Sequence, residues 1–107
     1  MELFITLLAI HFLCDFSLQG DYMAKNKVKR NFKDWWIVLT AHCFIHGLGV
    51  FLMLRLYDYN NDNAMACMIF MIVSHFLIDF SKNINLISFK TDQFLHIIVL
   101  MIISMSM

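Results

Sequence analysis

The stretch HFLCDFS at residues 11–17 is repeated, with one substitution, as HFLIDFS at residues 75–81. Each copy places a histidine and an aspartate four residues apart, and this spacing brings the two side chains onto one face of an α-helix. Each copy also lies inside a long apolar run, where ionisable side chains are energetically costly. The repeated phrase therefore predicts membrane helices that carry a polar site.

The composition of the chain supports a membrane protein. The chain has 107 residues, of which 61% are hydrophobic and 15% are charged, and it has no proline. A soluble domain of this size cannot bury so much apolar surface. Four apolar runs cover about residues 2–19, 35–57, 63–82 and 91–107, each near the roughly 20 residues that cross a bilayer. We expect one all-α transmembrane domain over residues 1–107, folded as an integral membrane four-helix bundle.

The arrangement of the spans follows from the repeat. The two spans that hold the repeated phrase point in the same direction, so we expect the halves to form a parallel repeat about a pseudo-two-fold axis along the membrane normal. Gly47 and Gly49 follow His46 and should let the second span approach a neighbour closely. The first run lacks a basic start and a small-residue cleavage site, so we expect a retained span.

Charged residues predict the orientation in the membrane. The connection at residues 20–34 contains most of the bases, namely Lys25, Lys27, Lys29, Arg30 and Lys33. The positive-inside rule places this connection in the cytoplasm and both termini outside it, in an inner membrane. The same bases are a weaker candidate for binding anionic lipid or an anionic substrate. Zero formal net charge argues against nucleic acid as a main partner.

Every histidine has a histidine or an aspartate four residues away. These polar groups lie late in the first and third spans and early in the second and fourth. Because successive spans are antiparallel, all four sets fall in the same half of the bilayer, where they predict a polar pocket open to the cytosol. The candidate metal ligands are His11, Asp15, His42, His46, His75, Asp79, Asp92 and His96.

Imidazole and carboxylate are the ligands that zinc, iron and manganese use in proteins. Such a divalent metal would activate water or polarise a phosphoryl or carbonyl oxygen. Asp15 and Asp79 are candidate catalytic bases, and Gln19 and Gln93 are candidates for orienting ligands or substrate. Lys82 is a candidate for pairing with a carboxylate or binding phosphate, although a lysine reaching toward the membrane surface is the preferred interpretation. Eight ligands exceed the need of one ion, so either some only support the others or there are two metals.

The leading hypothesis is a metal-dependent hydrolase or phosphoryl-type transferase, acting on a lipid or nucleotide group at the cytoplasmic face. The alternative is a non-enzymatic oligomeric membrane protein, either an ion or proton path or a membrane effector. Under either hypothesis we expect the bundle to form a homo-oligomer. In a third interpretation, the polar cluster only holds together the helices of a regulatory subunit. The chain contains no glycine-rich phosphate loop or other cofactor signature that selects a substrate.

The pattern resembles an uncharacterised bacterial and phage membrane family, domain of unknown function 3307. The resemblance covers nearly the whole chain and rests on residues 11–19, 21–24, Lys27, His42, His46, 75–79, Lys82 and 92–96. It implies a helical protein with several spans. It implies no activity, so the functional hypotheses rest on the residues themselves.

Overall fold

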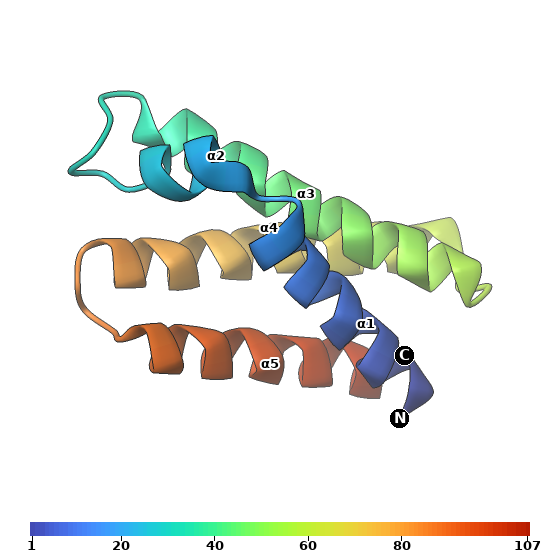
Figure 1. Cartoon of the computed structure of the whole chain (residues 1–107). Coiled ribbons are helices and arrows are strands. Elements are labelled where there is room, and N and C mark those ends of the chain that lie inside the picture. Colours follow the sequence, from blue (N-terminus) through green and yellow to red (C-terminus); the bar gives the residue numbers. More distant parts are fainter.

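The computed structural model describes all residues, Met1–Met107, and contains helices without strands. The all-helical class expected from the sequence is therefore confirmed. The elements are α1 (Glu2–Phe12), the π-helical turn η1 (Leu13–Ser17), α2 (Gly20–Asn26), α3 (Trp35–Leu56), α4 (Asn61–Asn83) and α5 (Phe89–Ser106), as Figure 1 shows.

Short polar turns connect the three long helices. Asn60 precedes α4 and accepts a hydrogen bond from the Asn63 backbone at 2.8 Å, and Ser88 precedes α5 and accepts one from Thr91 at 3.2 Å. Such caps satisfy backbone donors that the first helical turn leaves free. Asp58 and Asn85 adopt positive φ angles of 66° and 63°, which these residue types tolerate better than most. Consecutive long helices are consequently antiparallel neighbours (Figure 1).

The first part of the chain is bent. The backbone continues from α1 into η1, where the Leu18 amide donates to the Leu13 carbonyl five residues earlier at 2.8 Å. Gly20 then adopts a φ of +72°, a conformation that glycine reaches without steric cost. The axis turns by 86° between Glu2–Ser17 and Gly20–Asn26, and α2 packs against α3. This corrects the expectation of a simple connection at residues 20–34, which instead begins with a helix.

Three helices are long and apolar enough to cross a membrane. They are α3, α4 and α5, with mean hydropathies of 2.0, 1.9 and 1.3 over their most apolar windows. The bent pair of Glu2–Ser17 and Gly20–Asn26 adds a fourth span only if it is counted as one broken helix. A membrane location is plausible on this basis.

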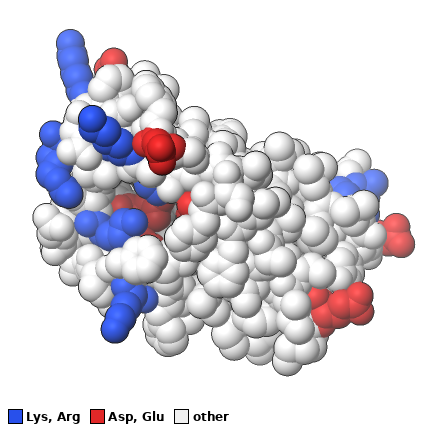
Figure 2. All heavy atoms as spheres, viewed as in Figure 1, with Lys and Arg blue, Asp and Glu red and all other residues white.

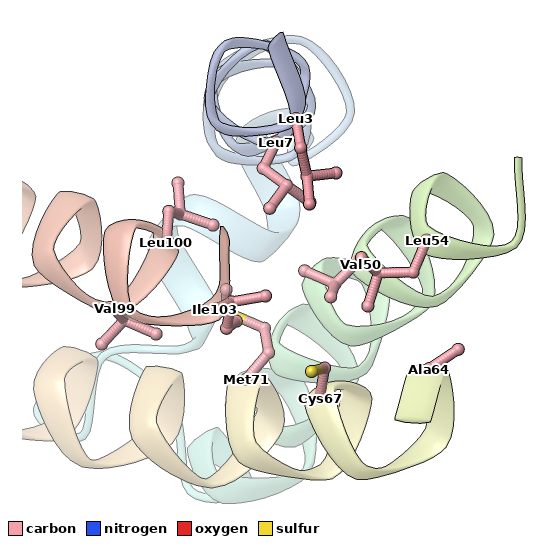
Figure 3. Packing of buried hydrophobic residues seen from close by; sticks show 10 residues of the cluster. All are labelled: Leu3, Leu7, Val50, Leu54, Ala64, Cys67, Met71, Val99, Leu100 and Ile103. Atoms are coloured by element: carbon pink, nitrogen blue, oxygen red, sulfur yellow. The ribbon is translucent and has the colours of Figure 1, made fainter. Parts of the chain in front are cut away.

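The long helices and α1 pack in a ring in which α1 and α4 each contact both α3 and α5. Their apolar core lies at the end of the molecule that holds both termini (Figures 1 and 3), and it consists of Leu3, Leu7, Val50, Leu54, Ala64, Cys67, Met71, Val99, Leu100 and Ile103. A Cβ on Gly47 would lie 2.5 Å from the Ile72 side chain of α4, and one on Gly49 would lie 2.5 Å from Ile10 of α1. The close approach expected at these glycines is therefore confirmed.

Polar and charged side chains are more often buried here than in a typical soluble protein. Ten of the 25 buried residues are polar or charged, whereas large apolar side chains such as Phe44, Ile69, Leu77 and Phe94 are exposed on the outer faces. Contiguous exposed apolar surface of this kind marks contact with lipid or with another protein. The fold thus presents apolar side chains outward and concentrates its polar groups inside.

Candidate metal centre

The eight candidate ligands form one buried cluster beyond the apolar core, toward the turn between α4 and α5. The four long segments each contribute two of them: α1 and η1 carry His11 and Asp15, α3 carries His42 and His46, α4 carries His75 and Asp79, and α5 carries Asp92 and His96. Each of the eight is at most 7% exposed. The four pairs lie at the same level of the helices, as the sequence pattern predicts, and their side chains therefore meet.

Three donor atoms form a nearly equilateral triangle at the centre of the cluster. The Nε2 atoms of His42 and His75 are 3.2 Å apart, and each lies 3.4 Å from Oδ2 of Asp79. Ligands about 2.05 Å from a tetrahedral zinc are separated from one another by roughly 3.3 Å. The triangle therefore has the dimensions of one face of a zinc coordination tetrahedron.

Asp15 extends the set of donors on one side of this triangle. Its Oδ1 lies 3.2 Å from Nε2 of His42 and 3.1 Å from Nε2 of His46. Asp15, His42, His46 and His75 each offer one ligand atom, and all four atoms lie within 4.8 Å of one another. These residues make a group of three imidazoles and one carboxylate, which is a donor set that zinc, iron and manganese accept.

His75, Asp79 and His96 form a second group that meets the same 4.8 Å limit. Nε2 of His96 lies 3.0 Å from Oδ1 of Asp79 and 3.3 Å from Oδ1 of Asp92. His75 belongs to both groups, but one imidazole nitrogen binds one ion. The two groups therefore overlap, and they cannot both be complete at the same time.

Gln93 connects the carboxylates of η1 and α5. Its Nε2 donates to Oδ2 of Asp15 at 2.9 Å and to Oδ2 of Asp92 at 3.2 Å, while its Oε1 lies 3.3 Å from Nε2 of His11. Hydrogen bonds of this kind fix the orientation of metal-binding carboxylates. Gln93 thus contacts both carboxylates and His11, and its orienting role stays a prediction.

Ring stacking also orients the imidazoles. The ring of His75 stacks on His46 with centroids 3.8 Å apart and on His96 with centroids 4.1 Å apart. The Nδ1 atoms of His11, His42 and His75 are buried without a hydrogen-bond partner, so these rings are oriented by ring contacts and by the contacts of Nε2.

The cluster contains carboxylate oxygens that lack hydrogen bonds. Oδ2 of Asp79 and Oδ1 of Asp92 are both buried and make none. A buried polar atom without a partner carries a desolvation penalty of about 1–3 kcal/mol, and more when it is charged. Oδ2 of Asp79 faces two imidazole nitrogens and, at 3.5 Å, the Nζ of Lys27, so a metal ion at the triangle would give it the direct ligand that it lacks. The residues present thus fit a divalent metal ion.

Lys27 also belongs to the cluster, although its sequence position predicts only a base in the connection at residues 20–34. It follows α2 and is 8% exposed, and its Nζ lies 3.5 Å from Oδ2 of Asp79 and 3.4 Å from Nε2 of His42. Asn83 holds this segment, because its Nδ2 donates to the Lys27 carbonyl at 2.7 Å and its Oδ1 accepts from the Lys29 amide at 3.0 Å. In the sequence, the one indication that Lys27 belongs to the site is its place among the residues that carry the family resemblance.

Two of the expected site residues lie apart from the donor atoms. Nε2 of Gln19 donates to the backbone carbonyl of Asp15 at 3.0 Å and not to its carboxylate. Nζ of Lys82 lies over the Phe89 ring, 5.6 Å from its centroid. The half-buried Lys82 therefore makes a cation–π contact at the edge of the molecule, in keeping with the preferred interpretation of a lysine that reaches toward the surface.

The chain is thus an all-helical protein, with helices apolar enough for a membrane and a buried histidine–aspartate cluster able to coordinate a metal ion. It belongs to the family described as "Protein of unknown function (DUF3307)", which matches residues 3–107. No curated protein matches the chain. No solved structure matches it either.

Proposed function

We propose that the cluster binds a divalent metal ion (zinc, iron or manganese) and that the chain is a metal-dependent membrane enzyme. The observation that carries this proposal is the triangle of His42, His75 and Asp79, with edges of 3.2, 3.4 and 3.4 Å. Three donors from two helices converge at the spacing of metal ligands, and one of them is a buried carboxylate oxygen without a hydrogen bond.

The proposed setting is an inner membrane, which the chain crosses four times as a helical bundle with a parallel internal repeat. Apolar outer faces support the insertion, and the first span is the bent one. The bases of residues 25–33 support a cytoplasmic location for the end that holds the cluster, with both termini on the other side. Self-association into a homo-oligomer is part of the proposal, since the outer faces also offer surface for helix pairing.

The proposed reaction is hydrolysis or phosphoryl-type transfer on a lipid or nucleotide group. A bound divalent ion would supply Lewis acidity and a water of lowered pKa. Asp15 and Asp79 are the carboxylates placed to accept a proton, because each lies against imidazoles at the centre of the cluster. Gln93 would keep Asp15 oriented through its 2.9 Å hydrogen bond.

The test is the metal content of protein purified in mild detergent without chelator, measured by elemental mass spectrometry. We expect a metal-to-chain ratio of about one, and its loss in a variant that combines His42→Ala with Asp79→Asn. A screen of lipid and nucleotide phosphoesters, with and without chelator, then tests the reaction. Metal-free protein that remains folded and active would contradict both parts of the proposal.

A non-enzymatic role is the second candidate, and one observation favours it. Several contacts in the cluster are already satisfactory hydrogen bonds without a metal, such as His46 to Asp15 at 3.1 Å and His96 to Asp79 at 3.0 Å. Chains of this type conduct protons or hold membrane helices together. Proton flux in liposomes that depends on these residues but is indifferent to chelator would favour this candidate over the enzyme.

A further inference from the structure

Lys27 differs from every other base in the chain. It is the only buried residue among the eight lysines and arginines. Burying an ammonium group costs several kcal/mol unless the group is paired. Its partners are Oδ2 of Asp79 at 3.5 Å and Nε2 of His42 at 3.4 Å, so its burial is coupled directly to the proposed metal ligands.

The buried aspartates of the cluster outnumber its one buried lysine. Asp15, Asp79 and Asp92 supply three negative charges, and Lys27 supplies one positive charge. These four side chains together carry an excess of two negative charges, which a divalent cation would offset.

The position of Lys27 also favours a single metal ion in the cluster. The distances from Nζ to His42 and Asp79, 3.4 and 3.5 Å, nearly equal the edges of the donor triangle. The ammonium group therefore lies beside the triangle at the spacing of a neighbouring ligand or substrate atom. A second ion on this side of His42 and Asp79 would have to displace it.

The surroundings of Lys27 are suited to a negatively charged group. Figure 2 shows carboxylate atoms deep in a hollow at the end of the molecule where most lysine and arginine side chains gather. An adjacent cavity of about 370 Å³ is lined by Arg30, Lys82 and Asn83 among others, and Asn83 is also the residue that binds the Lys27 backbone. Two bases thus line a cavity beside the segment that carries Lys27.

We propose that Lys27 is the second cation of the site: the cluster takes one divalent ion per chain, and the Lys27 ammonium beside it binds an oxygen of an anionic phosphoryl group. This inference rests on the proposed function and narrows its substrate class to phosphoryl compounds. A metal ion and a lysine together stabilise the negative charge on phosphoryl oxygens. A carbonyl substrate would gain less from a buried ammonium, since its oxygen carries no charge before the reaction.

The experiment compares metal and phosphate binding in four proteins: the wild type, Lys27→Met, Lys27→Arg and Lys25→Met. Lys25 is the matched control, because it lies on α2, is exposed and carries the same charge. Metal stoichiometry is measured by elemental mass spectrometry. Inorganic phosphate is the probe, and its binding to the zinc-loaded protein in detergent is measured by calorimetry and by ³¹P nuclear magnetic resonance.

We expect one metal ion per wild-type chain, and phosphate affinity about 10- to 100-fold weaker in Lys27→Met, the value of a hydrogen bond to a charged group. Lys27→Met should keep at least one metal ion per chain, Lys27→Arg should retain phosphate binding, and Lys25→Met should match the wild type. Should Lys27→Met not fold, Lys27→Gln serves in its place with the same expectation.

Two metal ions in the wild type, or equal phosphate affinity in Lys27→Met and the wild type, would overturn the inference while leaving the metal site intact. Phosphate that fails to bind the metal-loaded wild type would do the same. Absence of metal from every protein would overturn the proposed function, and the inference with it. The failure of the inference is thus distinguishable from the failure of the function on which it rests.

Discussion

The two copies of the repeated phrase, His11–Ser17 and His75–Ser81, have nearly the same sequence but different structures. The second copy runs through a regular part of α4, whereas the first passes from α1 into a π-helical turn and ends just before an 86° bend. In both copies the aspartate lies close to its own histidine, at 3.5 Å in the first and 3.4 Å in the second. The local geometry of the phrase is therefore conserved while the backbone around it is not.

The two aspartates also differ in the one partner of each that is not a histidine. Asp15 accepts a hydrogen bond from the neutral amide of Gln93, whereas Asp79 faces the charged Lys27. His75 belongs to both candidate metal groups, and His11 belongs to neither. The comparison teaches that the second copy offers both its histidine and its aspartate as metal ligands, whereas the first copy offers only Asp15.

The largest difference is expected between the two histidines of the phrase. His75→Ala should abolish stoichiometric metal binding, because both groups lose a donor. His11→Ala should keep the metal with an affinity about 10- to 100-fold weaker, as for a residue that only orients a ligand. Competitive metal titration of both variants measures the difference. Equal losses would show that the copies are equivalent.

The two aspartates should differ in their effect on stability. In chelator-treated protein, Asp79→Asn leaves the Lys27 ammonium buried without its partner, and we expect a loss of about 3–5 kcal/mol in the free energy of unfolding. Asp15→Asn leaves neutral partners and should cost about 1–3 kcal/mol. Denaturant unfolding in detergent measures both values. Adding Lys27→Met to Asp79→Asn should restore much of the loss, and no recovery would contradict the ion pair.

The residues eight positions after each histidine, Gln19 and Asn83, give a smaller contrast. Asn83 makes two hydrogen bonds to the Lys27–Lys29 backbone, and Gln19 makes one to the Asp15 backbone. At roughly 1 kcal/mol for each bond, Asn83→Ala should cost about 2 kcal/mol and Gln19→Ala about 1 kcal/mol. Lys90→Ala on α5, where the side chain is exposed, is the control and should be nearly neutral. A Gln19 effect as large as that of Asn83 would contradict this account of how Lys27 is held.

The bend after the first copy depends on the backbone conformation of Gly20. Gly20 has a φ of +72° with open space around it, so Gly20→Ala should cost about 1–2 kcal/mol through backbone strain alone. Gly20→Asn should cost less, because asparagine tolerates this conformation. Thermal unfolding of the two variants tests the order, and a larger loss for asparagine than for alanine would contradict it.

Much of the cluster could be predicted from sequence because it depends on two simple periodicities. Spacings of four residues put His75 and Asp79 on one helix face, and the alternation of span direction puts all four sets at one depth. Lys27 could not be predicted this way, because a lysine in a basic run normally lies in solvent. Its burial depends on the positive φ of Gly20 and on the hydrogen bonds of Asn83, and both are tertiary features that no local period encodes.

The π-helical turn also sets the angular phase of the N-terminal helix. Successive residues of an α-helix are rotated by roughly 100° about its axis. Inserting or deleting one residue therefore rotates the side chains that precede it by that angle relative to those that follow. Leu3 and Leu7 reach the apolar core while Asp15, in η1, reaches the histidines. Deleting Cys14 would remove one residue between Leu7 and Asp15 and turn the two ends of this segment out of phase. Either the leucines or the aspartate would then face lipid, so the first copy of the phrase works only with its irregular turn.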